Sequence, residues 1–202
     1  MSGTSSNLIN KAVEQLSRFP GIGQKSALRM ALFLLKRPEG DTLELNNALQ
    51  KMRSQIKFCN QCYNLSDSEL CNVCISPSKD STMVCIVKDF QDVIAIENTG
   101  QYHGLFHVLG GVISPVDGVG PSDIKIPELF NRIKLGEIKE AVIALSSTLE
   151  GDTTEYYIAK KLRELGVQVS TLSKGISVGG ELEFADEITL ARSIKNRVTI
   201  DD

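Results

Sequence analysis

Apolar residues in the first third of the chain recur at the three- and four-residue spacing of amphipathic helices. One helix is predicted over residues 7–19, before a proline, and a second over residues 24–36. A third is predicted from Asp41 to Ile56, starting at a capping box that Asp41 forms with Glu44. The apolar face of the first helix carries Leu8, Ala12, Leu16 and Phe19.

From residue 82 the pattern changes to continuous apolar runs rich in β-branched residues, which are typical of strands buried on both faces. These runs alternate with amphipathic stretches. Strands are predicted over residues 82–89, 104–111, 140–146 and 167–173, and helices over residues 92–100, 126–134 and 153–166. Such alternation predicts a parallel sheet with helices on both of its faces.

The changes in pattern predict a multidomain α+β protein with four parts. A helical domain covers residues 1–57, and a short polar segment that contains cysteines covers residues 58–80. An α/β domain with a parallel sheet covers residues 81–174. Residues 175–202 have too little apolar content to fold alone, so we expect them to pack on the sheet or on a neighbouring subunit.

Charge is unevenly distributed along the chain, whose formal net charge is -3. Residues 1–60 contain nine Lys and Arg against four Asp and Glu, whereas residues 81–202 contain twelve against eighteen. This asymmetry places any contact with a polyanion in the first third of the chain. The start of the chain has no signal-peptide pattern and no apolar run is long enough to span a membrane, so we expect a cytoplasmic protein.

The stretch FPGIGQKSALRM separates the first two predicted helices and has the pattern of a helix-hairpin-helix. Gly21 and Gly23 allow backbone conformations closed to other residues, and they let a bulky partner approach the main chain. The second helix would then point its free N–H groups outward from about Gln24, where they favour an anion such as a DNA phosphate. Lys25 and Arg29 would share one face of that helix. The alternative is a tight corner between helices whose glycines only save space.

Four of the five cysteines form a C-x2-C-x8-C-x2-C array of Cys59, Cys62, Cys71 and Cys74. Two such knuckles close a tetrahedral thiolate site for one structural Zn²⁺, with no position left open for water. The alternatives are a redox pair or an iron–sulfur cluster. The fifth cysteine, Cys85, lies in an apolar strand and is expected in the core.

The order of hairpin, four-cysteine segment and α/β domain, together with two long motifs, resembles the RecR family of bacterial recombination mediators over essentially the whole chain. The motifs are DVIAIENTGQYHGLFHVLGGVISPVDGVGPSDI and GISVGGELEFADEITLARSI. The resemblance implies that the α/β part is a Toprim domain and that subunits form rings, typically tetramers, that clamp DNA. It implies partners, RecO and in some bacteria RecF, in loading RecA onto gapped DNA, and it implies no enzymatic activity. Lys25 and Arg29 fall on the family's basic hairpin positions.

Related Toprim enzymes hold Mg²⁺ with a Glu after the first strand and a D-x-D after a later one. In this chain Lys88, Ser146 and Thr148 occupy those positions by resemblance, and only Glu150 and Gly151 of the later motif remain. Mg²⁺ prefers anionic oxygen ligands, so we do not expect this site to hold it well. Two alternative functions are kept. One is a Mg²⁺-dependent Toprim nuclease or primase, against which the missing carboxylates argue. The other is a protein scaffold that does not contact DNA.

Acidic side chains of the α/β domain are predicted to form a patch that docks a basic partner such as RecO. The set is Asp92, Glu97, Asp117, Glu150 and Asp152. The plain alternative is a solvated rim of the sheet. His103 and His107 are expected to be structural, because a metal or catalytic role would need neighbouring carboxylates.

Overall fold

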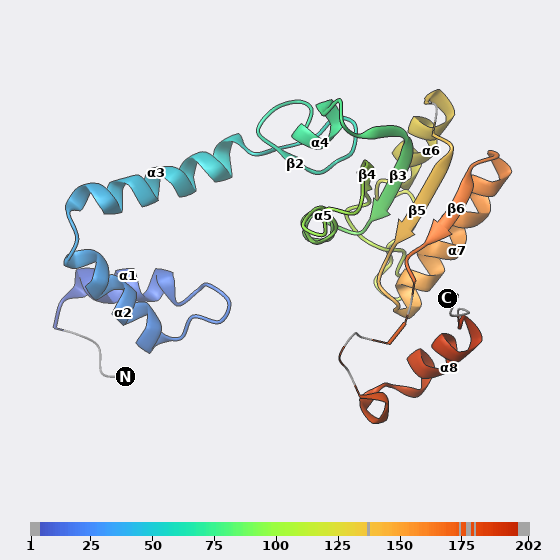
Figure 1. Cartoon of the computed structure of the whole chain (residues 1–202). Helices are drawn as coiled ribbons and strands as arrows, with labels where there is room; N and C mark the ends of the chain where they lie inside the picture. Colours follow the sequence, from blue (N-terminus) through green and yellow to red (C-terminus); the bar gives the residue numbers. More distant parts are fainter. Residues whose placement is uncertain (1–4, 137, 174, 177–178, 180, 198–202) are drawn as a thin grey trace. The chain divides into compact units, whose positions relative to one another are not determined.

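The computed structural model describes residues 5–136, 138–173, 175–176, 179 and 181–197. The chain divides into two compact units, Met1–Ile56 and Lys57–Asp202 (Figure 1). The first unit contains the predicted helical hairpin. The second contains the cysteines, the sheet and the C-terminal helix.

The first unit consists of α1 (Asn7–Leu16), α2 (Gln24–Leu35) and α3 (Glu39–Gln55). The hydroxyl of Ser6 caps α1 by accepting a hydrogen bond from the N–H of Ile9. Ala27 and Ala31 are the buried residues of α2, and their small side chains let α1 and α2 pack closely.

Two predicted helix ends in this unit are wrong by two or more residues. The first helix ends at Leu16 rather than at residue 19, because the chain tightens into turns in which the N–H of Phe19 bonds the carbonyl of Leu16. The third helix begins at Glu39, after Pro38, and not at Asp41. The Asp41 carboxylate accepts a 2.9 Å hydrogen bond from Nε of Arg37 instead of forming a capping box.

The second unit is built on a parallel four-stranded sheet in the order β4-β3-β5-β6. The strands are β3 (Asp80–Val87), β4 (Gly104–Val108), β5 (Glu140–Ala144) and β6 (Gln168–Thr171). This arrangement confirms the predicted fold class. The first strand ends two residues earlier than predicted, because Asp89 already caps the following helix.

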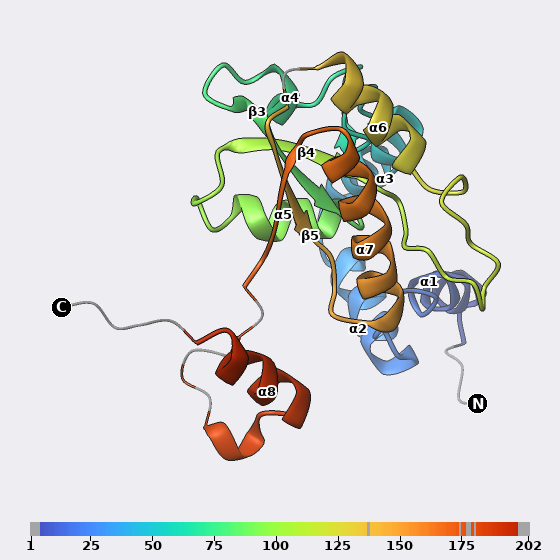
Figure 2. The same ribbon diagram turned by 90° about the vertical axis from the view of Figure 1, so that its right-hand side faces the viewer.

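Helices cover both faces of the sheet, as Figure 2 shows. On one face, α6 (Ile126–Leu135) and α7 (Leu149–Glu164) pack against Val84 and Ile86. On the other face, α5 (Phe90–Glu97) packs against Cys85 and Val87, so Cys85 is a core residue as expected. Alternate residues of one strand thus face different helices, which explains why its sequence is a continuous apolar run.

Two short segments frame the sheet. In the segment that contains the cysteines, β1 (Lys57–Phe58) pairs with β2 (Leu65–Ser66), and α4 (Asn72–Ile75) is a single turn. The C-terminal segment contains η1 (Leu182–Phe184) and α8 (Glu187–Lys195), where no helix was predicted. An ion pair joins α8 to α7, so this segment contacts the sheet domain.

Candidate nucleic-acid interface and metal centre

The glycine hairpin between α1 and α2 has the backbone geometry that its sequence predicts. Gly21 has φ +77°, a conformation that residues with a Cβ rarely adopt, and Gly23 is the extended N-cap of α2. The N–H of Ile22 bonds the carbonyl of Phe19 and closes the turn. A Cβ at Gly23 would meet nothing within 4 Å, so the space in front of this glycine is open to an external partner.

The first turn of α2 is electropositive, and no acidic side chain of that turn neutralises it. The N–H of Ala27 is the first to bond within the helix, to the carbonyl of Gly23, so the three N–H groups before it point out of the helix end. The first turn contains no acidic residue and the N-cap has no side-chain hydrogen bond. Such a helix end attracts anions through its dipole and its N–H groups.

Lys25 and Arg29 are both exposed on α2, one turn apart. Neither forms an ion pair or a side-chain hydrogen bond with another of the described residues. Two such cations next to an open helix N-terminus can contact successive phosphates without reading bases. The hairpin thus places Gly21, Gly23, Lys25 and Arg29 on one short stretch of surface, and their contact with DNA remains a prediction.

The four predicted zinc ligands converge in the second unit. Their Sγ atoms all lie within 4.8 Å of one another, with 3.5 Å between those of Cys62 and Cys71 and 3.8 Å between those of Cys59 and Cys74. All four thiols are free rather than disulfide-bonded. The N–H of Cys71 donates to Sγ of Cys59, the type of backbone contact that stabilises a thiolate. This set of soft donors fits one tetrahedral Zn²⁺.

The four clustered thiols need a nearby positive charge if all of them are to ionise. A hydrogen bond from Cys74 lowers the pKa of Cys62 to about 5, whereas burial raises the pKa of Cys71 to about 11. The pKa of Cys74 is also raised, through its hydrogen bond to Cys62 and then through burial. One thiolate therefore forms readily and its charge opposes ionisation of the others. A bound Zn²⁺ would supply the positive charge that lets all four ionise.

The first knuckle is attached to the edge of the sheet. The N–H of Val108 on β4 donates a 2.8 Å hydrogen bond to the carbonyl of Cys62. The ring of Tyr63, a residue with φ 62°, meets the ring of His107 edge-on at 5.5 Å, and Nζ of Lys125 lies 5.0 Å from the Tyr63 ring centre. The knuckle therefore covers part of an otherwise exposed edge strand.

His107 and His103 lie in different environments. His107 is completely buried in β4, and its Nε2–H donates a 2.8 Å hydrogen bond to the carbonyl of Lys125. Burial lowers the pKa of His107 to about 4. His103 is exposed and precedes the strand. His107 thus links the zinc knuckle to the loop before α6, which nothing in the local sequence indicated.

The carboxyl ends of β3 and β5 form the position at which related Toprim enzymes hold metal. Val87 pairs with Ala144 in the sheet, so Lys88 follows one strand and Ser146 and Thr148 follow its neighbour. The Thr148 hydroxyl caps α7 by accepting a 3.1 Å hydrogen bond from the N–H of Gly151. These groups offer an ammonium and hydroxyls where Mg²⁺ would need carboxylates.

Gly151 is required by the turn that leads into α7. A Cβ at this position would overlap the backbone carbonyl oxygen of Ser146. The glycine retained from the Toprim motif therefore has a packing reason that does not depend on metal binding.

Four of the five predicted docking acids are held by groups of the same chain. Asp92 accepts hydrogen bonds from the N–H groups of Lys88 and Asp89, and Glu97 pairs with Lys79 at 2.6 Å. Asp117 accepts from the hydroxyl of Ser114, and Asp152 pairs with Arg192. The fifth, Glu150, lies in the first turn of α7, where a carboxylate is favoured by the helix dipole. A docking role for these residues remains a prediction.

Among the described residues, the four cysteines are the only group of three or more potential ligands close enough to share a metal ion. The acidic residues that the structure describes do not converge in this way. Among the described residues, the structure therefore supports one metal centre, at the cysteines.

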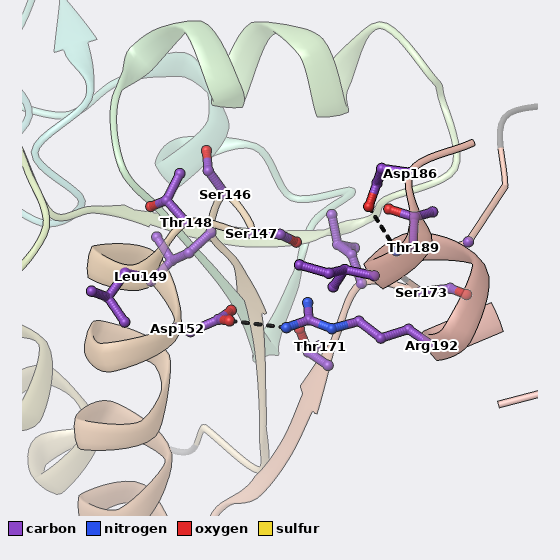
Figure 3. A pocket seen from close by; sticks show the side chains of 14 residues that line it. Ser146, Ser147, Thr148, Leu149, Asp152, Thr171, Ser173, Asp186, Thr189 and Arg192 are labelled. Carbon is purple, nitrogen blue, oxygen red and sulfur yellow. Dashed lines mark hydrogen bonds and ion pairs between the residues drawn. The ribbon is translucent and has the colours of Figure 1, made fainter. Parts of the chain in front are cut away.

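A cavity of about 700 Å³ opens beside that edge, between the start of α7 and α8 (Figure 3). Arg192 reaches from α8 across the cavity to Asp152 on α7, at 3.1 Å. Arg192 was not among the predicted site residues, because no helix was predicted where α8 lies. The signal was present in Asp186, whose carboxylate caps the helix by accepting from the N–H of Thr189.

The architecture defines a class of protein that joins a helix-hairpin-helix, a four-cysteine zinc finger and a Toprim domain in one chain. The RecR helix-hairpin-helix family matches residues 9–53, and the RecR zinc-finger family, which is defined by four cysteines, matches residues 56–76. The Toprim domain family matches residues 82–173, and the RecR C-terminal family matches residues 175–198.

Relatives match almost the whole chain. Recombination protein RecR of Flavobacterium johnsoniae is 53% identical over 194 residues, which are 96% of this chain and 94% of the relative. The RecR proteins of Porphyromonas gingivalis and Bacteroides thetaiotaomicron are 49% and 51% identical, over 98% and 94% of this chain and 96% and 93% of their own lengths. The chain therefore belongs to the RecR family of recombination proteins. Within the described residues, no helix is both long and apolar enough to cross a bilayer.

Proposed function

We propose that the chain is a non-catalytic recombination mediator that clamps DNA as a ring-shaped homotetramer in the cytoplasm. In this role it works with RecO, and in some bacteria with RecF, to load RecA onto gapped DNA. The observation that carries the proposal is the open hairpin, where an exposed helix N-terminus lies beside Lys25 and Arg29 without acidic neighbours in its first turn. The names of the relatives support a role in recombination.

The surface of the first unit supports assembly of several chains. Many of its large apolar side chains are exposed, and Leu8 is 80% exposed. A groove of about 390 Å³ runs between α1 and α2 and is lined by Leu8, Ile9, Ala12, Leu16, Leu34 and Leu35. Contiguous exposed apolar surface marks sites of protein association. Association of the first units would also bring several basic hairpins together, and avidity would strengthen modest individual contacts.

DNA binding by the hairpin is tested by fluorescence anisotropy over a series of salt concentrations. Lys25→Ala with Arg29→Ala is compared with the wild type on duplex DNA. The control is Lys134→Ala with Lys139→Ala, which removes two exposed positive charges from the other unit. Each lost phosphate contact should make the slope of log K against log salt shallower by about 0.9. Unchanged affinity and slope in the hairpin variant, or an equal effect of the control, would contradict the proposal.

Assembly is tested separately by multi-angle light scattering. Leu8→Glu with Leu35→Glu places charges in the apolar groove, and we expect the oligomer to dissociate while helix content is retained. The matched control is Glu14→Lys with Lys11→Glu, which alters exposed charges of α1 outside the groove. A fully assembled groove variant would show that association uses another surface.

A further inference from the structure

A pocket of about 380 Å³ lies at the amino-terminal ends of β3 and β4, beside the end of α6. We call it the α6 pocket. It is at the opposite end of the strands from the Toprim edge, and it is separate from the hairpin. The first cysteine knuckle, the two strands and the end of α6 each contribute to its lining, which includes Gln61, Ser81, Leu105, Arg132, Leu135 and Ile138.

Arg132 brings a positive charge to this pocket. Its Nη1–H donates a 2.6 Å hydrogen bond to the carbonyl of Phe106 on β4. Its Nη2 is buried and has no hydrogen-bond partner among the described residues. A buried N–H donor without an acceptor costs free energy, so a ligand that supplies the acceptor would bind favourably there.

The acidic residues around Arg132 do not neutralise it. None of the described residues that line the pocket is acidic. Asp80 and Glu140 begin β3 and β5, and each carboxylate accepts a hydrogen bond from a hydroxyl group. Glu128, one turn before Arg132 on α6, pairs with a lysine. In the described part of the chain, the Arg132 guanidinium therefore has no carboxylate partner.

Aliphatic side chains form much of the remaining wall. Leu105 is buried, Ile138 is half-buried, and Leu135 at the end of α6 is 90% exposed. Contact with a ligand would remove the exposed Leu135 side chain from water. Gln61 and Ser81 are exposed and offer an amide and a hydroxyl to the backbone of a ligand.

We propose that the α6 pocket binds a short acidic and apolar segment of a partner protein, with a carboxylate at Arg132 and an aliphatic side chain against the leucine and isoleucine walls. A carboxylate carries the single negative charge that one guanidinium neutralises, and it forms charge-assisted hydrogen bonds. A nucleic-acid strand repeats its charge at every phosphate, so it would need a row of cations and would leave the aliphatic walls uncovered. The proposal goes beyond the proposed function and does not depend on DNA binding by the hairpin.

The test uses the full chain and an acetylated, amidated leucyl-aspartyl-leucine tripeptide. Methyl NMR of the protein labelled at leucine and isoleucine follows the pocket directly. We expect saturable shifts at the methyl groups of Leu105, Leu135 and Ile138. The same tripeptide with asparagine in place of aspartate should bind about tenfold more weakly, because it lacks the charge that pairs with Arg132.

Variants at exposed positions test the pocket without removing the bond from Arg132 to β4. Ser81→Asp supplies a carboxylate at the pocket and should weaken binding of the aspartyl peptide about tenfold. Ser122→Asp adds the same charge at an exposed position outside the pocket and should bind normally. Leu135→Ser should weaken binding, whereas Leu149→Ser, at another highly exposed leucine, should not.

Glu137 lies between Gly136 and Ile138 in the sequence and outside the described residues, so Glu137→Gln is tested as well. Peptide binding that appears only in this variant would show that the chain's own carboxylate competes for the pocket, and it would refute the proposal.

Three other results would overturn the proposal. The absence of saturable shifts at the three methyl groups in the wild type would show that the pocket does not bind such a segment. Equal affinity for the aspartyl and asparaginyl peptides would show that Arg132 does not recognise a carboxylate. Displacement of the peptide by oligothymidylate that shifts the same methyl groups and binds more tightly would make the pocket a nucleic-acid site.

Discussion

The N–H of Val108 donates a 2.8 Å hydrogen bond to the carbonyl of Cys62, which joins a zinc ligand residue directly to the edge strand of the Toprim sheet. The bond places the cysteine knuckle on β4, where it covers an edge that would otherwise offer unpaired backbone groups. The zinc centre thus supports the sheet as well as the short segment that contains it.

Removal of zinc should expose the Val108 amide. Chelation with EDTA leaves clustered thiols that cannot all ionise, so we expect the knuckle to leave β4. Hydrogen exchange of the Val108 amide should accelerate at least about fivefold, equivalent to a hydrogen bond of about 1 kcal/mol. The next amide, Leu109, bonds the carbonyl of Val87 inside the sheet and serves as the internal control. Equal acceleration at both amides would indicate general unfolding, and unchanged exchange at Val108 would refute the link.

The two hairpin glycines should respond differently to substitution. Gly21 needs a positive φ, so Gly21→Ala should lower the stability of the protein by about 1–2 kcal/mol, measured by urea denaturation. Gly21→Asn should cost less, because asparagine tolerates this conformation better. Retention of full stability in Gly21→Ala would mean that the turn does not need this geometry.

Gly23 has an extended backbone that other residues can also adopt. We expect it to matter because the absence of a side chain leaves open space at the N-terminus of α2. Gly23→Ser should keep or raise stability, since serine is a good N-cap. Its hydroxyl would bond a first-turn N–H and occupy the space of a phosphate, so anisotropy should show DNA binding weakened about fivefold, roughly 1 kcal/mol. Normal DNA affinity in this variant would favour the interpretation of the hairpin as a mere corner.

Periodic and motif-like features were predictable from the sequence, and features set by tertiary contacts were not. Apolar alternation predicted the parallel sheet, and cysteine spacing predicted the metal centre, because each depends on residues close in sequence. The start of α3 was missed because the Asp41 carboxylate is engaged by Arg37. The contacts of His107 were not predicted, because its partners Tyr63 and Lys125 lie far from it in the sequence.

Restoring carboxylates should convert the Toprim edge into a Mg²⁺ site. The triple variant Lys88→Glu, Ser146→Asp, Thr148→Asp supplies anionic oxygens at the ends of two paired strands, and aspartate can still cap α7. We expect Mg²⁺ to raise its melting temperature and to have no such effect on the wild type. The neutral control is Lys88→Gln, Ser146→Asn, Thr148→Asn. A Mg²⁺ response in the wild type, or Mg²⁺-dependent nicking of supercoiled plasmid, would revive the nuclease alternative.

Protonation of His107 should destabilise the fold in mildly acidic solution. Burial depresses its pKa from 6.5 to about 4, so between these values the unfolded chain binds a proton that the folded chain does not. The stability that this histidine contributes is therefore complete above pH 6.5 and is lost as the pH falls towards about 4. The full loss is about 3 kcal/mol, from about 1.4 kcal/mol for each unit of pKa difference.

Urea denaturation across this pH range measures the free energy of unfolding of the wild type and of histidine variants. The variants are compared with one another, because protonation of the cysteines also changes stability in acid. His107→Gln removes the titrating group while keeping a side-chain N–H for the Lys125 carbonyl, so its stability should fall less steeply with pH than that of the wild type. His103→Gln, at an exposed position, should keep the wild-type steepness. Identical pH dependence in the wild type and both variants would show that His107 titrates normally and is not held neutral between the knuckle and the loop before α6.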